Sequence, residues 1–219
     1  FMSIDLLLDF ESQALFAIFT YLKENPGFHD INEISEQIGF EKRTTLKYLE
    51  RLAMLSNEVK ERIGIAPLTI SERNYRIIQQ NYVENKELSL AIYHISIKID
   101  LLEGLLLNKE NTMDSLTDKY NLSYSTLKKD VYEVRDFLKE ANIDLHIRNG
   151  EIVLSGLEPT IRLFFLSFFW QLYGGYGHPF NIENSTEKNF IFEKLSFLLS
   201  DQIDPITKIQ YDYLVDITC

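Results

Sequence analysis

Three basic residues, Arg43, Lys47 and Arg51, recur every four positions in the first quarter of the sequence. At about 100° per residue, this spacing places them on one side of a helix. The opposite side is predicted to face a core and holds Thr45, Leu46, Leu49, Leu52 and Ala53. Guanidinium and ammonium groups on an exposed helix can hold phosphates or read guanine edges in the major groove. The spacing therefore predicts nucleic-acid binding, with a merely solvated helix face as the alternative interpretation.

Hydroxyl groups accompany these cations near the start of the same predicted helix. Thr44 is suited to a hydrogen bond with a phosphate or a base edge. The DNA contacts predicted for this helix are Lys42, Arg43, Thr44, Lys47, Tyr48 and Arg51.

The residue pattern around this helix occurs a second time, 82 residues later and without a gap. The residues Ile31, Ile34, Ile38, Gly39, Phe40, Thr44, Lys47, Leu49 and Leu52 correspond to Met113, Leu116, Tyr120, Asn121, Leu122, Thr126, Lys129, Val131 and Val134. A repeat at a fixed offset indicates two copies of one small unit. Each copy has the spacing of a helix, a tight turn and a second helix, which is a helix-turn-helix.

The second copy carries a different set of polar residues on its second helix. Arg43 corresponds to Ser125 and Arg51 to Glu133, so the equivalent ten-residue window is neutral. Hydroxyl groups at a helix N-terminus still favour phosphate. The DNA contacts predicted for the second copy are Tyr124, Ser125, Thr126, Lys128, Lys129 and, at the tip of a hairpin, Arg148. We expect the first copy to supply more of the electrostatic attraction.

Local signals predict the elements that position these residues. Asp30 and Glu33 form a capping box before the first short helix, Thr112 caps its counterpart, and Gly39 and Asn121 occupy the turns. Asn149-Gly150 between alternating apolar residues is a strong hairpin signal. The predicted helices cover residues 5–24, 31–38, 42–55, 88–107, 113–120 and 125–141, and the first hairpin is expected over 62–65 and 68–71.

A helix-turn-helix followed by a hairpin is a winged helix. The predicted fold class is mainly α with short β wings: two tandem winged helix-turn-helix domains, followed by the start of an all-α regulation domain. The predicted domains are residues 1–82, 83–156 and 157–219, the last truncated and with helices over 159–173, 187–199 and 205–217.

The overall charge is unusual for a nucleic-acid binder. The chain has 33 acidic and 22 basic residues and a net charge of −11. Binding depends on the local field of one face, so this charge does not exclude DNA. No apolar run is long enough for a membrane span, no signal peptide is recognisable, and Cys219 has no partner for a disulfide. We expect a cytoplasmic protein.

Catalytic and metal-binding patterns are absent from the sequence. The histidines His29, His94, His146 and His178 are isolated from one another, without the spacing of metal ligands. His178, in a Gly-rich loop, is a candidate regulatory residue. No phosphate-binding loop, nucleophile elbow or carboxylate-pair motif is present. We therefore expect no enzymatic activity, no cofactor and no metal.

Two segments resemble a known family. The run NGEIVLSGLEPTIR at residues 149–162 is similar to a segment of multi-domain bacterial regulators that contain phosphotransferase-system regulation domains. The run LSYSTLKKDV at residues 122–131 resembles their helix-turn-helix. These regulators include the Mga-like activators and the mannitol- and lichenan-type operon activators, and the balance of the sequence favours the Mga-like group.

The resemblance implies a transcriptional activator that binds double-stranded promoter DNA. It also implies a homodimer or oligomer formed through the C-terminal region, and RNA polymerase or phosphotransferase-system proteins as further partners. Sugar status, acting through histidine phosphorylation, would then set the activity. The competing hypothesis is a winged-helix protein-interaction module that does not bind DNA, which the net charge and the neutral second helix favour.

Overall fold

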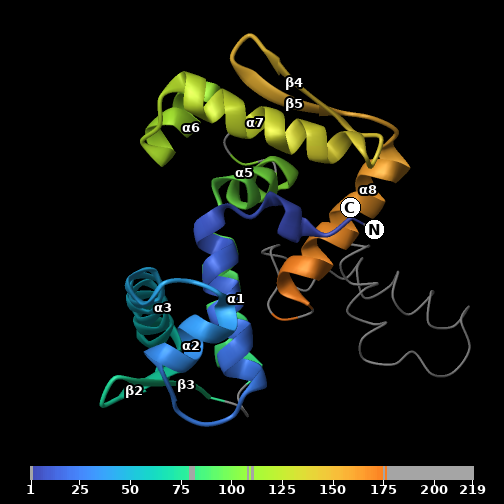
Figure 1. The fold of residues 1–219 in the computed structure, drawn as a ribbon. Helices are drawn as coiled ribbons and strands as arrows, with labels where there is room; N and C mark the ends of the chain where they lie inside the picture. The colour runs from blue at the N-terminus through green and yellow to red at the C-terminus, as the bar shows by residue number, and fades with distance from the viewer. Residues whose placement is uncertain (1, 79–81, 108, 110, 175, 177–219) are drawn as a thin grey trace, which may run out of the picture. The chain divides into compact units, whose positions relative to one another are not determined.

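The computed structural model describes residues 2–78, 82–107, 109, 111–174 and 176 (Figure 1). The described part is mainly helical, with two small antiparallel sheets. It divides into two compact units, one comprising Leu8–Asp100 and the other Phe1–Leu7 with Leu101–Cys219. Each unit is described by itself. Among the described residues, no helix has the length and apolar character needed to cross a bilayer.

The unit Leu8–Asp100 is built on helices that pack around one apolar core. Its elements in chain order are α1 (Phe10–Glu24), β1 (His29–Asp30), α2 (Ile31–Ile38), α3 (Lys42–Ile63), β2 (Leu68–Ser71), β3 (Asn74–Ile77) and α4 (Tyr82–Tyr93). Helix α1 packs against α2, α3, α4 and β3. The core is centred on fully buried side chains, among them Leu15, Ile18, Ile34, Leu49, Leu52 and Ile77.

Two predicted helices of this unit have different bounds in the structure. The helix expected over residues 5–24 is interrupted, because Asp9 caps α1 by accepting a hydrogen bond from the Ser12 amide at 2.8 Å. A short 3₁₀ helix, η1 (Ile4–Leu7), precedes it. Helix α3 continues beyond residue 55 to Ile63, since its buried positions continue through Val59 and Gly64 ends it with a φ of 87°.

The hairpin predicted over residues 62–65 and 68–71 is wrong in its first strand. The sheet has the order β1-β3-β2, and β2 pairs with β3 so that Leu68 lies opposite Ile77. The turn is Glu72-Arg73, with φ values of 49° and 67°. Two non-glycine residues in the left-handed region are uncommon, so the sequence did not signal this turn.

Helix α5 (Ile97–Leu106) crosses the division, and its residues from Leu101 onward belong to the second unit. A second set of helices and a hairpin follow. The further elements are α6 (Met113–Tyr120), α7 (Tyr124–Lys139), β4 (Asp144–Arg148), β5 (Glu151–Ser155) and α8 (Glu158–Tyr173). The 3₁₀ helix η1 packs on α7 and α8, where the amide of Ile4 donates to Gln171 Oε1 at 3.1 Å.

Strands β4 and β5 form the hairpin that the Asn-Gly signal predicted. Asn149 and Gly150 have φ values of 52° and 82°, and Arg148 lies opposite Glu151. A single bridge, Thr112 to Glu151, joins the hairpin to the start of α6, and the amide of Met113 donates to the Gly150 carbonyl at 2.7 Å. The hairpin is thereby held against the helix-turn-helix.

One long helix expected over residues 88–107 is replaced by two. Helix α4 ends at Tyr93, and α5 begins at Ile97. Between them, the amide of Ser96 donates to Tyr93 O and the carbonyl of Ser96 accepts from the Asp100 amide, so the helical hydrogen-bond pattern restarts at Ser96. The helix predicted over 159–173 is confirmed as α8. The helices predicted over 187–199 and 205–217 lie outside the described residues.

Candidate nucleic-acid interface

The turn between α2 and α3 fixes the start of the first candidate recognition helix. Asp30 accepts hydrogen bonds from the amides of Asn32 and Glu33, and Glu33 accepts one from the Asp30 amide, which completes the predicted capping box. These amide hydrogen bonds, above all the one from Glu33, lower the pKa of Asp30. Gly39 ends α2 with a φ of 74°, the left-handed conformation that the sequence predicted.

The first turns of α3 present three of the predicted cations. Lys42, Arg43 and Lys47 are exposed, and Thr44 is half-buried. The Lys47 ammonium lies 5.4 Å from the centroid of the Tyr48 ring. The first two turns of α3 therefore offer three cations to a polyanion.

Two other residues predicted on this face have structural contacts. Arg51 is half-buried and its Nε lies 3.3 Å from Glu11 Oε1 on α1. The third of the basic residues spaced four positions apart is therefore already paired with a carboxylate. Tyr48, predicted to contact DNA, is only 5 % exposed and belongs to the core, where it packs against Phe10 and Phe40. Its position at about 240° from Lys42 turns it to the buried side of the helix. The prediction for Tyr48 is therefore wrong.

Leu46 departs from the prediction in the opposite direction. It was expected to face the core, but it is 40 % exposed. Its helical position lies about 40° from Lys42 and about 60° from Leu49, at the margin of the buried side. The exposed part of α3 thus combines cations with two large apolar side chains, Leu46 and Met54.

The second candidate recognition helix, α7, begins after a residue whose side chain caps it. Thr112 caps α6, and Asn121 ends it in the left-handed conformation. Ser123 then caps α7: its Oγ accepts from the Thr126 amide at 3.2 Å and lies 3.0 and 2.8 Å from the hydroxyl oxygens of Ser125 and Thr126. The predicted hydroxyl residues are brought together, but in a cluster that Ser123 organises.

The predicted DNA contacts of α7 do not all share one side of the helix. Tyr124, Ser125, Thr126 and Lys129 are exposed, and Lys128 is half-buried. At about 100° per residue, Lys128 lies on the edge marked by Tyr124, about 100° away from Lys129. The sequence treated the two lysines as one group, whereas the helix separates them.

Three residues of α7 that the sequence reasoning left out lie along this edge. The Tyr132 ring, 38 % exposed, has the Lys128 ammonium 5.5 Å and the Arg135 guanidinium 4.3 Å from its centroid. Lys139 follows one turn after Arg135 and is exposed. The spacing of 128, 132, 135 and 139 is the signal for this edge, and it lies outside the positions equivalent to Arg43, Lys47 and Arg51.

The two hairpin tips each expose an arginine. Arg148 is exposed next to the Asn149-Gly150 turn, as predicted. Arg73, exposed at the Glu72-Arg73 turn, was missed because the first hairpin was placed too early in the sequence. Arg76 on β3 is instead stacked over the Phe28 ring, 4.5 Å from its centroid.

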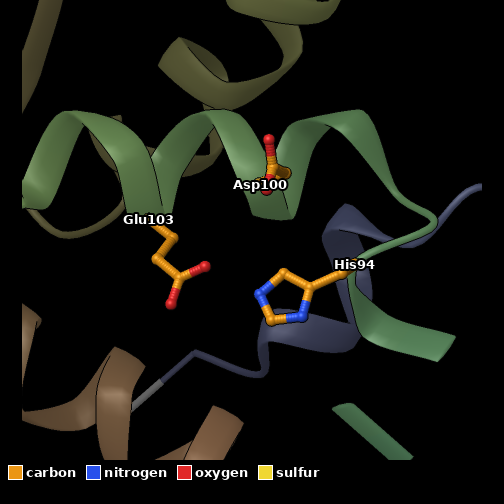
Figure 2. A group of neighbouring side chains, drawn as sticks. All are labelled: His94, Asp100 and Glu103. Carbon is orange, nitrogen blue, oxygen red and sulfur yellow. The ribbon is translucent and has the colours of Figure 1, made fainter. Parts of the chain in front are cut away.

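Three further side chains around the α4–α5 connection are of types that ligate cations. Figure 2 shows His94 in the connecting segment and Asp100 and Glu103 on α5. The Tyr173 hydroxyl donates to Glu103, and His94 Nδ1 lies 3.0 Å from the Leu90 carbonyl oxygen. The division between the two compact units falls between Asp100 and Leu101, so we infer no ligand site from this group. The candidate regulatory residue His178 lies outside the described residues.

One comparison with known proteins bears on this interface. Residues 81–169 match the model of the Mga helix-turn-helix domain, a range that includes α6, α7 and the β4–β5 hairpin. No curated protein matches the chain. Helix-turn-helix domains are typical of DNA-binding regulators rather than enzymes. Residues 81–169 are therefore similar to the Mga helix-turn-helix domain, and the resemblance to Mga-like regulators that the sequence predicted is confirmed over this range.

Proposed function

We propose that this protein is a transcriptional regulator that binds promoter duplex DNA through two winged helix-turn-helix units. One unit lies within residues 1–82 and uses α3, and the other lies within residues 83–156 and uses α7. The observation that carries this proposal is the Mga helix-turn-helix match over α6 and α7.

The first unit has the same order of elements as the matched one. In both, a short capped helix ends at a residue with left-handed backbone, Gly39 or Asn121, and a longer helix and an antiparallel hairpin follow. Strand β1 precedes α2 and pairs with β3. Correspondingly, Thr112 precedes α6 and forms a bridge with Glu151 on β5. This correspondence supports a duplication in which the second copy lies within the matched range and the first copy lies outside it.

The exposed cations on α3 support a DNA contact by the first unit. Arg43 and Lys47 lie on the first two turns, the part of a recognition helix that reaches base edges. Arg43 is suited to a bidentate contact with guanine and Lys47 to a phosphate. Arg51, already paired with Glu11, has a smaller part in this interface.

The Mga-like resemblance carries the wider proposal. The protein would activate transcription in the cytoplasm, assemble through its C-terminal region, and respond to phosphotransferase status. RNA polymerase and phosphotransferase proteins are the further partners that this proposal names.

The test uses the full chain and a duplex selected from a random-sequence library. The Arg43→Ala/Lys47→Ala variant should raise Kd by about 30-fold or more, since a base-reading arginine alone contributes about 1–3 kcal/mol. Fluorescence anisotropy of the labelled duplex measures the change. Arg51→Ala should have a smaller effect, because the guanidinium is committed to Glu11.

A charge-matched control is available on the same unit. Lys23→Ala/Lys60→Ala also removes two exposed cations, but from the last turns of α1 and α3. Lys60 lies about 25 Å along the helix from Arg43. Equal losses in the two double variants would contradict a local contact by α3. If no duplex is selected and no salt-sensitive binding to DNA occurs, the protein-interaction alternative is favoured.

A further inference from the structure

Five residues mark one continuous edge of α7: Tyr124, Lys128, Tyr132, Arg135 and Lys139. Their spacing of four, four, three and four residues keeps them in line on an α-helix, over about 22 Å. All are exposed or half-buried. We call this set the α7 edge. It carries three cations and no carboxylate, in a chain with a net charge of −11.

The ring of Tyr132 contacts two of the three cations of the α7 edge. The Tyr132 ring lies between the Lys128 ammonium at 5.5 Å and the Arg135 guanidinium at 4.3 Å from its centroid. Such cation–π contacts reduce the freedom of long side chains while leaving their charge available. Lys128 and Arg135 are therefore preorganised around one ring rather than independent flexible side chains.

The α7 edge differs from the face on which α3 carries its cations. The positions of α7 equivalent to Arg43, Lys47 and Arg51 hold Ser125, Lys129 and Glu133. Conversely, the α3 positions equivalent to the α7 edge are Lys42, Leu46, Glu50, Ala53 and Asn57, with a single cation. The two helices thus concentrate positive charge on neighbouring but different edges.

We propose that the α7 edge binds the sugar–phosphate backbone of duplex DNA. Lysine and arginine neutralise phosphates, and tyrosine hydroxyl groups donate hydrogen bonds to phosphate oxygens. Charge complementarity selects this occupant, because the edge has only cations and aromatic hydroxyls to offer. The inference rests on the proposed function and assigns the backbone contact to a surface that the repeat alone did not indicate.

A carboxylate next to the edge supplies a sharp test of this idea. Asp136 Oδ1 accepts from Arg135 Nε and Nη2 at 3.1 and 3.0 Å, and lies 3.5 Å from Lys139 Nζ. In the free protein this carboxylate partly neutralises two cations of the edge. A phosphate that binds there competes with Asp136, so removing the carboxylate charge should strengthen DNA binding.

The experiment compares single and double variants of the full chain on a mixed-sequence duplex of 30 base pairs, over a salt series. Lys128→Gln/Arg135→Gln should weaken binding about tenfold and reduce the slope of log K against log salt by about 2, for two lost phosphate contacts. Asp136→Asn should tighten binding several-fold. The matched control is Lys23→Gln/Lys60→Gln, which also removes two exposed cations, but from the last turns of α1 and α3. It should leave Kd near the wild-type value.

Each outcome separates this inference from the proposed function. If the wild-type chain shows no salt-sensitive binding to any duplex, the proposed function fails and this inference with it. If the wild type binds, but Lys128→Gln/Arg135→Gln weakens binding no more than the control variant does, the edge assignment alone is overturned. Binding of an acidic protein through the α7 edge, without any binding of DNA there, would also overturn the edge assignment. Thermal melts followed by circular dichroism verify that all variants are folded.

Discussion

The ring of Tyr48 contacts Phe10 at the start of α1 and Phe40 before α3, with centroid separations of 6.4 and 6.0 Å. These contacts pack the first turns of α3, the candidate recognition helix, against the unit's core. Arg51 adds a polar tie to the same helix through Glu11. Both residues therefore contribute by positioning α3, while Arg43 and Lys47 remain exposed on its outer side.

Truncating Tyr48 should destabilise the unit without removing a DNA-contacting group. Tyr48→Ala is expected to lower the free energy of unfolding by about 3 kcal/mol, as for other buried aromatic residues. Tyr48→Phe keeps the ring and should retain both stability and DNA affinity. Urea denaturation and anisotropy titration measure the two quantities. A stable Tyr48→Phe protein with much weaker DNA binding would restore a direct role for the hydroxyl group.

At the scale of elements, the turn between α2 and α3 determines where α3, the candidate recognition helix, begins. Gly39 has a φ of 74° and an added Cβ would meet no atom within 4 Å, so only backbone strain opposes a side chain there. Gly39→Ala should therefore cost about 1 kcal/mol of unfolding free energy. The other unit supplies the control: Asn occupies the equivalent position 121 with a φ of 52°, so Gly39→Asn should cost less.

Chemical denaturation followed by circular dichroism distinguishes these two variants. Equal stability of the Ala and Asn proteins would mean that the turn tolerates any side chain. The strain argument for Gly39 would then be wrong.

The elements that the sequence predicted well are those with their own local signals. The Asp30–Glu33 capping box, the Thr112 cap and the Asn149-Gly150 turn each satisfy backbone groups within a few residues, so the pattern is visible without the fold. The Asp9 cap was also visible, but the apolar spacing across it continues, as it does across Ser96. Helix breaks hidden in a continuous apolar pattern depend on tertiary packing, which sequence periodicity does not record.

The candidate site was predictable in part for the same reason. Helical periodicity placed Arg43 and Lys47 on the exposed side of α3. It could not reveal that Glu11 pairs with Arg51, or which way Leu46 turns. On α7, the helical spacing of Tyr132 and Arg135 from Lys128 indicates a shared edge, and this signal is independent of the repeat.

At the scale of the whole molecule, a net charge of −11 must coexist with attraction to a polyanion. Only the field within roughly 10 Å of a surface acts at 0.1 M salt, so local cations can outweigh distant carboxylates. The cations that we assign to phosphate or base contact on the two helices are Lys42, Arg43, Lys47, Lys128, Arg135 and Lys139.

The salt dependence of DNA binding should reflect the number of these local contacts with phosphates rather than the net charge of the chain. Since Arg43 is assigned to a base, about five phosphates are neutralised, and the slope of log K against log salt is expected to be about −4.5. Anisotropy titrations of the full chain between low and moderate salt measure it. A slope near zero would indicate that electrostatic contact with the DNA backbone is not what holds the complex.

The hydrogen bonds that join the β4–β5 hairpin to the start of α6 also bear on local unfolding. Besides the Met113–Gly150 bond, the Ile152 amide donates to the Asn111 carbonyl at 2.8 Å. Detaching the hairpin would expose both amides together with the N-terminus of α6, which Thr112 caps. The hairpin and the helix should therefore open as one cooperative unit, and Arg148 at the tip keeps its place relative to α6 for as long as that unit stays closed.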